Sequence, residues 1–292
     1  AIGRAFMDAG LPPGVLNIVF GVPSEVSEHL CGSKIPRKLS FTGSIPVGKH
    51  LQKLAADNMI RCTMELGGHS PLMVFDDTDI DMAAKISVAG KFRNAGQVCV
   101  SPTRFLVQDT VKEQFIRAVI NETNKIKVGN GLDDGINMGP LIAERRIDIM
   151  KDFVNDAVEN GANIEMGGNR MNLEGSFFAP TILTNVSDNT KIMNEEPFGP
   201  LLPIDTFNSV DEVIDRANRL DFGLASYAFS NDPKIVSFLK SEIQAGLLAV
   251  NSTVVSTPET PFGGIKQSGY GSEGGIEGLD AFLVTRFISE SY

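Results

Sequence analysis

The chain has 292 residues, 42% of them hydrophobic, which is enough for one large or two ordinary domains around a core. Its formal net charge of −10, without a Lys/Arg cluster, argues against nucleic acid or an anionic membrane surface as partner. No apolar run approaches the ~20 residues that span a bilayer. Three cysteines without metal-ligand or disulfide spacing predict no metal site and favour a reducing, cytoplasmic location.

The first sixty residues predict alternating helices and strands. Residues 1–9 are typical of a helix end, 16–20 of a short buried strand, and Ser24 of the N-cap of a helix to about Gly32. A strand over 39–41 and a helix over 47–56 follow. This alternation predicts a parallel sheet. Because the chain opens at Ala1 inside a helix-like stretch, we expect it to be a piece of a longer protein.

The same alternation continues to the end of the chain. Helical spacing is expected over 79–95, 111–127, 147–158, 211–220 and 233–241. The first of these helices is apolar on several faces, which predicts that it is buried. Strands are expected over 60–66, 72–75, 103–108, 163–166, 177–183, 201–207, 225–229, 247–251 and, β-rich at the chain's end, 281–289.

Cys99 ends the stretch Phe-Arg-Asn-Ala-Gly-Gln-Val-Cys that begins at Phe92. The long helix before it delivers the thiol at the end of an element, where a nucleophile is accessible. A lone cysteine is more often a small buried hydrophobe, and packing is our interpretation of Cys31 and Cys62. A second stretch, Met-Glu-Leu-Gly-Gly, closes an apolar run with the carboxylate of Glu65. Its alternative interpretation is a solvated carboxylate at a strand end.

These two stretches, in this order and at this separation, resemble the two signatures of the aldehyde dehydrogenase superfamily. Further similar segments are Phe-Thr-Gly-Ser from Phe41, Glu-Glu-Pro-Phe-Gly-Pro from Glu195, and Pro-Phe-Gly-Gly from Pro261 with a later Ser-Gly. The resemblance covers essentially the whole chain but lacks the family's N-terminal portion. It implies an α/β fold in which a partial Rossmann-type cofactor domain precedes an α/β catalytic domain with a parallel sheet.

The resemblance also implies a division of the chain. Residues 1–67 would be the C-terminal part of the NAD(P)-binding domain, 68–270 the catalytic domain, and 271–292 a C-terminal return with an oligomerisation strand. That strand would pair with a neighbouring subunit, because a free β edge is an aggregation hazard. We therefore expect a homo-oligomer, a dimer or a tetramer. Without the upstream residues we expect the 292-residue polypeptide alone to show no measurable aldehyde oxidation.

The family chemistry assigns roles to both signatures. Cys99 would add to the aldehyde as a thiolate, and Glu65 would activate the thiol and later the hydrolytic water. Glu65 points to hydrolysis rather than to transfer of the acyl group to coenzyme A. The backbone N–H of Cys99 would hold the oxyanion together with an asparagine upstream of this chain, whereas Asn94 is expected to shape the loop.

Cofactor contacts are implied at three places. The turn after the second strand combines a strand end with a helix start, where backbone N–H groups can hold a phosphate, although such a turn is more often only a turn. In the family it contacts the pyrophosphate and nicotinamide end of the cofactor, which is NAD or NADP. The alternative interpretation of Glu196 is that it belongs to an acidic surface turn. The implied cofactor residues are Thr42, Gly43, Ser44, Leu66, Glu196 and Phe198.

Substrate contacts are implied at Arg93, Ser256 and Phe262. Phe-Arg-Asn-x-Gly-Gln-x-Cys resembles succinate-semialdehyde dehydrogenases, in which a guanidinium six residues before the nucleophile can pair a distal carboxylate. A structural salt bridge is the alternative for Arg93. Ser256 would add a hydroxyl donor and Phe262 would line the substrate tunnel. Ser101 stands where some relatives carry a second cysteine, so a local disulfide with Cys99 is not expected.

The leading hypothesis is an NAD(P)-dependent oxidation of a small-molecule semialdehyde, such as succinate semialdehyde, to its acid. Two alternatives stay open. One is a dehydrogenase of simple aliphatic or aromatic aldehydes, and the other is a non-catalytic fragment or scaffold that keeps the fold. His29, His50 and His69 show no metal or triad grouping and are expected to be solvated or loop residues.

Overall fold

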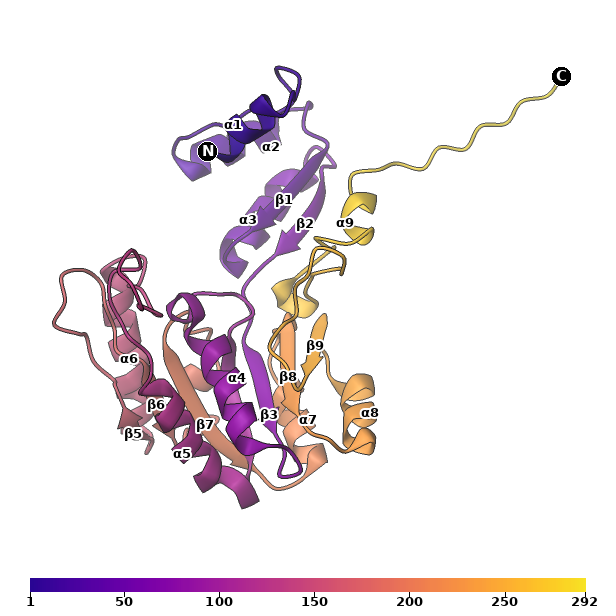
Figure 1. Ribbon diagram of the computed structural model, residues 1–292. Helices are drawn as coiled ribbons and strands as arrows, with labels where there is room; N and C mark the ends of the chain where they lie inside the picture. The colour runs from indigo at the N-terminus through magenta and orange to yellow at the C-terminus, as the bar shows by residue number, and fades with distance from the viewer.

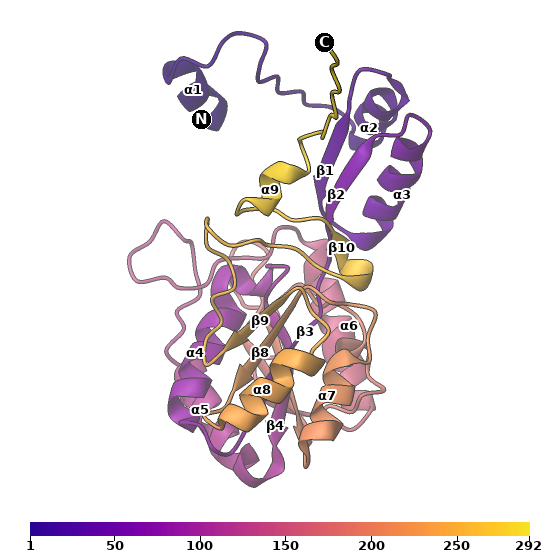
Figure 2. The ribbon, with the colours of Figure 1, turned by 90° about the vertical axis from the view of Figure 1, so that its right-hand side faces the viewer.

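The computed structural model describes residues 1–292, which form two separate sheets (Figure 1). The smaller sheet has the order β1-β2-β10, with β1 (Lys38–Thr42) parallel to β2 (Arg61–Glu65) and β10 (Gly269–Tyr270) antiparallel to β2. Helices α2 (Pro23–Gly32) and α3 (Ile45–Ala56) pack beside each other against it (Figure 2). The smaller sheet therefore unites the start of the chain with a segment close to its end.

The larger sheet has seven strands in the order β5-β6-β7-β4-β3-β8-β9. Only the edge strand β5 runs antiparallel to its neighbour. Both faces of a parallel sheet are normally covered, and every residue of β3 is buried. The strands are β3 (Ser70–Val74), β4 (Pro102–Gln108), β5 (Asn163–Met166), β6 (Thr181–Thr184), β7 (Leu201–Phe207), β8 (Ala225–Phe229) and β9 (Leu247–Val250).

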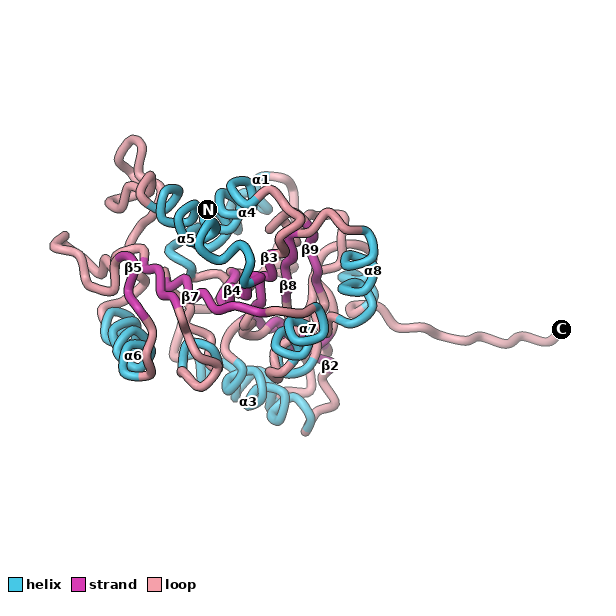
Figure 3. The backbone as a smooth tube through the Cα atoms, turned by 90° about the horizontal axis from the view of Figure 1, so that it is seen from below, coloured by secondary structure: helices cyan, strands magenta, loops and turns pink.

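Helices cover both faces of the larger sheet. Helices α4 (Ile80–Phe92) and α5 (Lys112–Thr123) lie on one face, and α6 (Arg145–Glu159) and α7 (Val210–Asn218) lie on the other (Figure 3). Helix α8 (Pro233–Glu242) connects β8 with β9. A core cluster of 44 buried residues fills the layers between them. No helix has both the length and the apolar character needed to cross a membrane.

Helix α4 leads to the cysteine loop and ends three residues earlier than expected. Asp79 caps it, because its side chain accepts a hydrogen bond from the N–H of Met82 at 3.0 Å. Its apolar side chains are buried on several sides, as predicted. The expectation that it runs to Ala95 was wrong, because Asn94 and Ala95 adopt left-handed backbone angles with φ of 51° and 54°.

The N-terminal segment differs from the sequence prediction in two ways. Helix α1 (Ile2–Asp8) forms, but residues 16–20 form no strand and Phe20 is 93% exposed. These residues find no strand in this chain to pair with, so their apolar side chains stay on the surface. Ser24 is not an N-cap, because Val22 occupies that position and Pro23 is the first helical residue.

One further strand is shorter than predicted, and the C-terminal strand, which we expect to pair with a neighbouring subunit, has no partner within the chain. Residues 177–183 yield only the short β6, since Phe177 to Pro180 lie in the loop that precedes it. Residues 281–289 follow the short helix α9 (Glu277–Asp280) and run away from the body without pairing (Figure 1). A strand needs a partner ladder, and this chain offers none to the C-terminal segment.

Candidate active site

A strained turn presents Cys99 at the entrance to β4. Asn94, Ala95 and Gly96 have φ of 51°, 54° and 71°, and three successive left-handed residues persist only where the surroundings fix them. The side-chain amide of Asn94 donates to the carbonyl of Gln97 at 3.0 Å, and the Gln97 N–H donates back to the Asn94 carbonyl at 3.1 Å. Asn94 thus shapes the loop that carries the thiol.

Glu65 is the last residue of β2 and is held on both sides by backbone pairing. Its register partners are Thr42 of β1 and Gly269 of β10. The residue is only 3% exposed, and neither carboxylate oxygen has a hydrogen-bond partner in the chain. Burial, and then the charge of Glu273, raise the pKa of Glu65 to about 8. The structure therefore holds a buried carboxyl group with free oxygens, not a solvated strand-end carboxylate.

Cys99 and Glu65 meet at two neighbouring cavities. We call the first the turn cavity, because it begins at the turn between β1 and α3; its volume is about 610 Å³. It contains every residue predicted to contact the cofactor. Besides Cys99 and Glu65 it is lined by Thr42, Gly43, Ser44, Leu66, Gly67, Gln97, Val98, Arg146, Glu196 and Phe198.

The second cavity, which we call the loop cavity, lies on the side of residues 256–262 and measures about 470 Å³. Ser256 and Phe262 line it together with Cys99 and Glu65. Arg93 does not. Its exposed side chain lines a third cavity of about 210 Å³, which also includes Ser256. Ser256 therefore lies between the thiol and the guanidinium.

The two glycines that follow Leu66 make room for Glu196. A Cβ at Gly67 would stand 2.4 Å from Glu196 Oε2, and the N–H of Gly68 donates to Glu196 Oε1 at 3.4 Å. Burial raises the pKa of Glu196 to about 7, while the Gly68 N–H, Lys91 and Arg146 act in the opposite direction. The motif Glu-Leu-Gly-Gly thus provides the carboxyl group of Glu65 and, through its two glycines, the space and the hydrogen bond for the carboxylate of Glu196.

The thiol of Cys99 is not a ready thiolate in this structure. Burial raises its pKa first, and the charges of Glu196 and Glu65 raise it further. Hydrogen bonds from the backbone N–H groups of Val100 and Cys99 act to lower it. A thiol in such surroundings needs a base to become nucleophilic, and Glu65 lines the same two cavities.

Two basic residues near the site were not identified by the sequence analysis. Arg146, from the first turn of α6, donates from Nη2 to the carbonyls of Pro197 and Phe198 and lines the turn cavity. Lys91, from α4, is fully buried beneath the cysteine loop. Neither lies in a recognisable motif, because no local pattern marks which charged residues of a helix will be covered by a distant loop.

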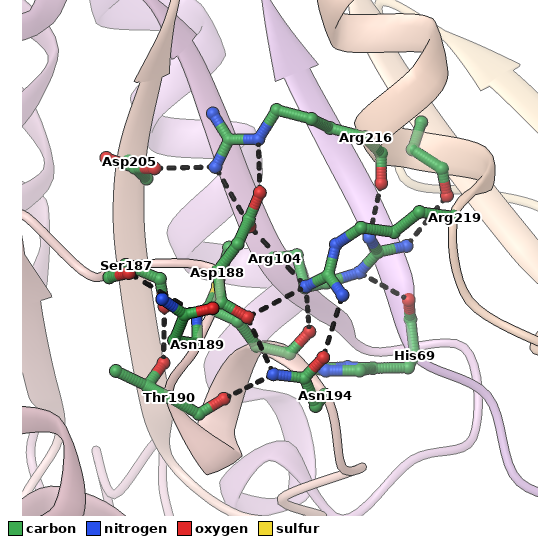
Figure 4. A network of polar contacts seen from close by, with 12 residues as sticks. His69, Arg104, Ser187, Asp188, Asn189, Thr190, Asn194, Asp205, Arg216 and Arg219 are labelled. Atoms are coloured by element: carbon green, nitrogen blue, oxygen red, sulfur yellow. Dashed lines mark hydrogen bonds and ion pairs between the residues drawn. The ribbon is translucent and has the colours of Figure 1, made fainter.

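His69 lies in the loop between β2 and β3, one of the two alternatives predicted, but it is 1% exposed and therefore not solvated. Its Nδ1 lies 2.7 Å from Thr103 Oγ1, and Arg104 Nε donates to its carbonyl at 3.1 Å. Figure 4 shows the network around it, in which Arg216 binds Asp188 and Arg219 binds Asn194. This network fixes the segment after Glu65 to the segment that leads to Glu196.

Burial lowers the pKa of His69 well below its ordinary value, and the nearby charges of Arg104, Lys91 and Arg219 lower it further. The ring is therefore neutral at physiological pH, which suits a packing residue. No group of three or more His, Cys, Asp or Glu side chains is arranged to hold a metal ion.

Comparison with known proteins identifies the family to which this chain belongs. The sequence matches the aldehyde dehydrogenase family over residues 1–288. The chain belongs to the aldehyde dehydrogenase family. Its relatives include 4-(hydroxymethyl)benzenesulfonate dehydrogenase of Comamonas testosteroni, 44% identical over 278 residues, which are 95% of this chain and 58% of the relative.

Two further relatives and one solved structure also match nearly all of this chain but only part of their own length. They are 3-sulfolactaldehyde dehydrogenase of Pseudomonas putida, 41% identical over 96% of this chain and 58% of the relative, and the NADP(+) succinate-semialdehyde dehydrogenase of Escherichia coli, 39% identical over 99% and 60%. A crystal structure of succinate-semialdehyde dehydrogenase from Burkholderia pseudomallei superimposes with a TM-score of 0.96, at 39% identity over 97% of this chain and 59% of that one. The chain spans a little under two thirds of these relatives' length.

Proposed function

We propose that this chain carries the catalytic residues of an NAD(P)-dependent aldehyde dehydrogenase that releases a free acid. The observation that carries the proposal is the position of Cys99 and Glu65, which line both the turn cavity and the loop cavity. A nucleophile and a base shared by two cavities can face a cofactor on one side and an aldehyde on the other.

The residues of the chain supply each proton transfer. The ionised form of Glu65, whose fraction grows as the pH approaches its pKa of about 8, accepts the thiol proton of Cys99, and the thiolate sulfur adds to the aldehyde carbon to form a thiohemiacetal. A bound nicotinamide supplies the acceptor for the hydride that leaves this carbon. Glu65 releases this first proton to solvent and then takes a proton from water, whose oxygen attacks the thioester on Cys99; as the acid leaves, the proton returns from Glu65 to the thiolate and restores the thiol.

The turn cavity has the features that a dinucleotide needs. Ser44 is the N-cap of α3, and the N–H groups of Ile45 and Val47 have no intrahelical partner and can face a phosphate, whereas Pro46 has no N–H. The N–H of Gly43 is already used by the carbonyl of Glu65 at 3.0 Å. Glu196 is seated to accept hydrogen bonds from ribose hydroxyls, and Phe198 is 37% exposed beside it. These residues fit NAD or NADP.

The substrate we propose is an aldehyde that carries a distal anion, such as a semialdehyde with a carboxylate. The names of three relatives specify succinate semialdehyde or a sulfonated compound, so each of these substrates has an anionic group. In this chain a substrate extending from Cys99 past Ser256 would bring its anion to Arg93. The guanidinium can pair a carboxylate with two parallel hydrogen bonds.

Selective alkylation tests the catalytic proposal against a non-catalytic scaffold. The purified protein is treated with iodoacetamide, and the modification rate of each cysteine is followed by mass spectrometry of its peptide. We expect Cys99 to react at least tenfold faster than Cys31 and Cys62, because it opens onto two cavities that also hold the base Glu65. Equal, slow modification of all three cysteines would mean that the fold is present without an activated nucleophile.

A further inference from the structure

Lys91 is the most unusual charged residue near the proposed site. It is 0% exposed in the last turn of α4, and it makes no ion pair with any carboxylate. Lysine is almost never fully buried without a partner. Burial lowers its pKa to about 7, and the charge of Glu196 acts in the opposite direction. Burial of a lysine without an ion pair is unfavourable, so its position needs a physical explanation.

The ammonium group contacts the loop that carries Cys99. Nζ donates to the hydroxyl of Ser101 at 3.4 Å, and that hydroxyl faces the backbone carbonyl of Lys91 at 3.4 Å. The N–H of Ser101 donates to the carbonyl of Val98 at 2.9 Å, which closes a tight turn around Cys99. Lys91 and Ser101 therefore fasten the residues on the C-terminal side of the nucleophile to α4.

The same nitrogen lies close to Gly96, which the segment after Glu196 also approaches. A Cβ at Gly96 would stand 3.3 Å from Lys91 Nζ and 2.1 Å from the carbonyl of Gly199. Only a glycine at this point allows the cysteine turn, the ammonium and the loop after Glu196 to come this close. The other cation that acts on Glu196 is Arg146, and the charges of Glu196 and Glu65 in turn act on Cys99.

We propose that Lys91 is a positioning residue whose buried ammonium joins the Cys99 loop to Glu196 and so aligns the nucleophile with the cofactor-side carboxylate. The roles of Cys99 and Glu196 in this inference rest on the proposed function. Each charge of the Lys91 and Glu196 pair favours the charged form of the other, since burial alone would neutralise both. Ser101 connects the pair to the turn around the thiol.

The test compares Lys91→Met, which removes the charge and keeps the length, with Lys85→Met. Lys85 lies exposed on the same helix and serves as the matched control. The pKa of Glu196 is measured by 13C NMR on protein with labelled glutamate carboxyls, with the Glu196 signal assigned through Glu196→Gln. We expect Lys91→Met to raise the pKa of Glu196 by about one unit, because a nearby cation is lost.

Amide hydrogen exchange gives a second, independent measurement. In Lys91→Met the Ser101 amide should exchange about tenfold faster, while the Leu106 amide in β4 keeps its rate. Ser101→Ala breaks the contact but keeps the ammonium, so it should speed the same exchange without moving the Glu196 pKa. It also tests the inference if Lys91→Met does not fold.

Two results would overturn the inference: an unchanged Glu196 titration in folded Lys91→Met, or an unchanged exchange rate of the amide at position 101 in Ser101→Ala. Both measurements are made without substrate or cofactor. Failure of selective alkylation at Cys99 would remove the proposed function while leaving the measured coupling between Lys91 and Glu196 in place.

Discussion

Glu65→Gln should make the protein more stable at alkaline pH. The native carboxyl group is buried without a hydrogen-bond partner and holds its proton up to a pKa of about 8, against an ordinary value of 4.5. Between these values the native state binds a proton that the unfolded state has released, so stability falls as the pH rises. Glutamine carries no charge at any pH and avoids this loss.

The size of the effect follows from the pKa. One pKa unit corresponds to about 1.4 kcal/mol, which bounds the full cost of ionising Glu65 at about 5 kcal/mol. Water in the two adjoining cavities screens the charge, so we expect roughly half of this, or about 2.5 kcal/mol, of which roughly 1.5 kcal/mol develops between pH 5.5 and pH 9. For a chain of this size that corresponds to a change of about 3 °C in melting temperature.

The assay is thermal unfolding of wild type and Glu65→Gln, followed by circular dichroism from pH 5.5 to pH 9. The difference in Tm should grow with pH and level off above pH 8. A constant difference would reflect only the new amide in the cavity. Glu174→Gln, at an exposed loop position, is the control and should show no such growth. A difference that is constant or shrinks with pH would refute the reasoning about Glu65.

The remaining predictions concern the complete protein. Cys99→Ser should abolish aldehyde oxidation in a spectrophotometric assay of NAD(P)H, and persisting turnover would exclude the cysteine mechanism. Arg93→Ala should lower kcat/KM for succinate semialdehyde by a factor equivalent to about 1.5–3 kcal/mol while butanal is little affected; equal losses on both substrates would leave Arg93 with a structural role. Light scattering should give the mass of a dimer or tetramer, in which residues 281–289 pair with a neighbouring subunit, and a monomer mass would contradict this pairing.

The central strands were predictable because parallel strands buried on both faces are continuous apolar runs. β4, β7 and β8 lie within a residue of their predicted ranges. The prediction over 16–20 used the same signal and was wrong for this chain, whereas residues 281–289, expected to pair with a neighbouring subunit, are unpaired within the single chain. An apolar, β-rich sequence indicates that a segment can form a strand, but the strand forms only when another segment offers backbone groups for hydrogen bonding.

The candidate site divides in a similar way. Cys99 and Glu65 were identified because the residues around them follow family signatures, and the structure places both at the same two cavities. Lys91 and His69 carry no such signature, and each was buried by segments distant in the sequence. Thr103, which contacts His69, lies 34 residues further along the chain, and burial of this kind leaves no mark in the local pattern.

The junction between the two sheets decides whether the proposed chemistry can occur. Glu65 ends a strand of the smaller sheet, whereas Cys99 lies in the loop that enters the larger one. Ser268 fastens the two sheets: its carbonyl accepts from the Leu66 N–H at 2.9 Å, and its hydroxyl donates to the Gly67 carbonyl at 2.8 Å.

The Gly223 N–H, which comes from the larger sheet's side, donates to that same hydroxyl at 3.0 Å. Ser268 is fully buried, so no water replaces these bonds if the hydroxyl is lost. Ser268, more than 160 residues after Cys99, thus helps to hold the end of β2, and with it the base, against the larger sheet. The apolar sequence pattern predicts each sheet separately. The alignment of the two sheets depends on the segment around Ser268, which returns from the larger sheet to the smaller one. The proton transfer that we propose depends on this alignment.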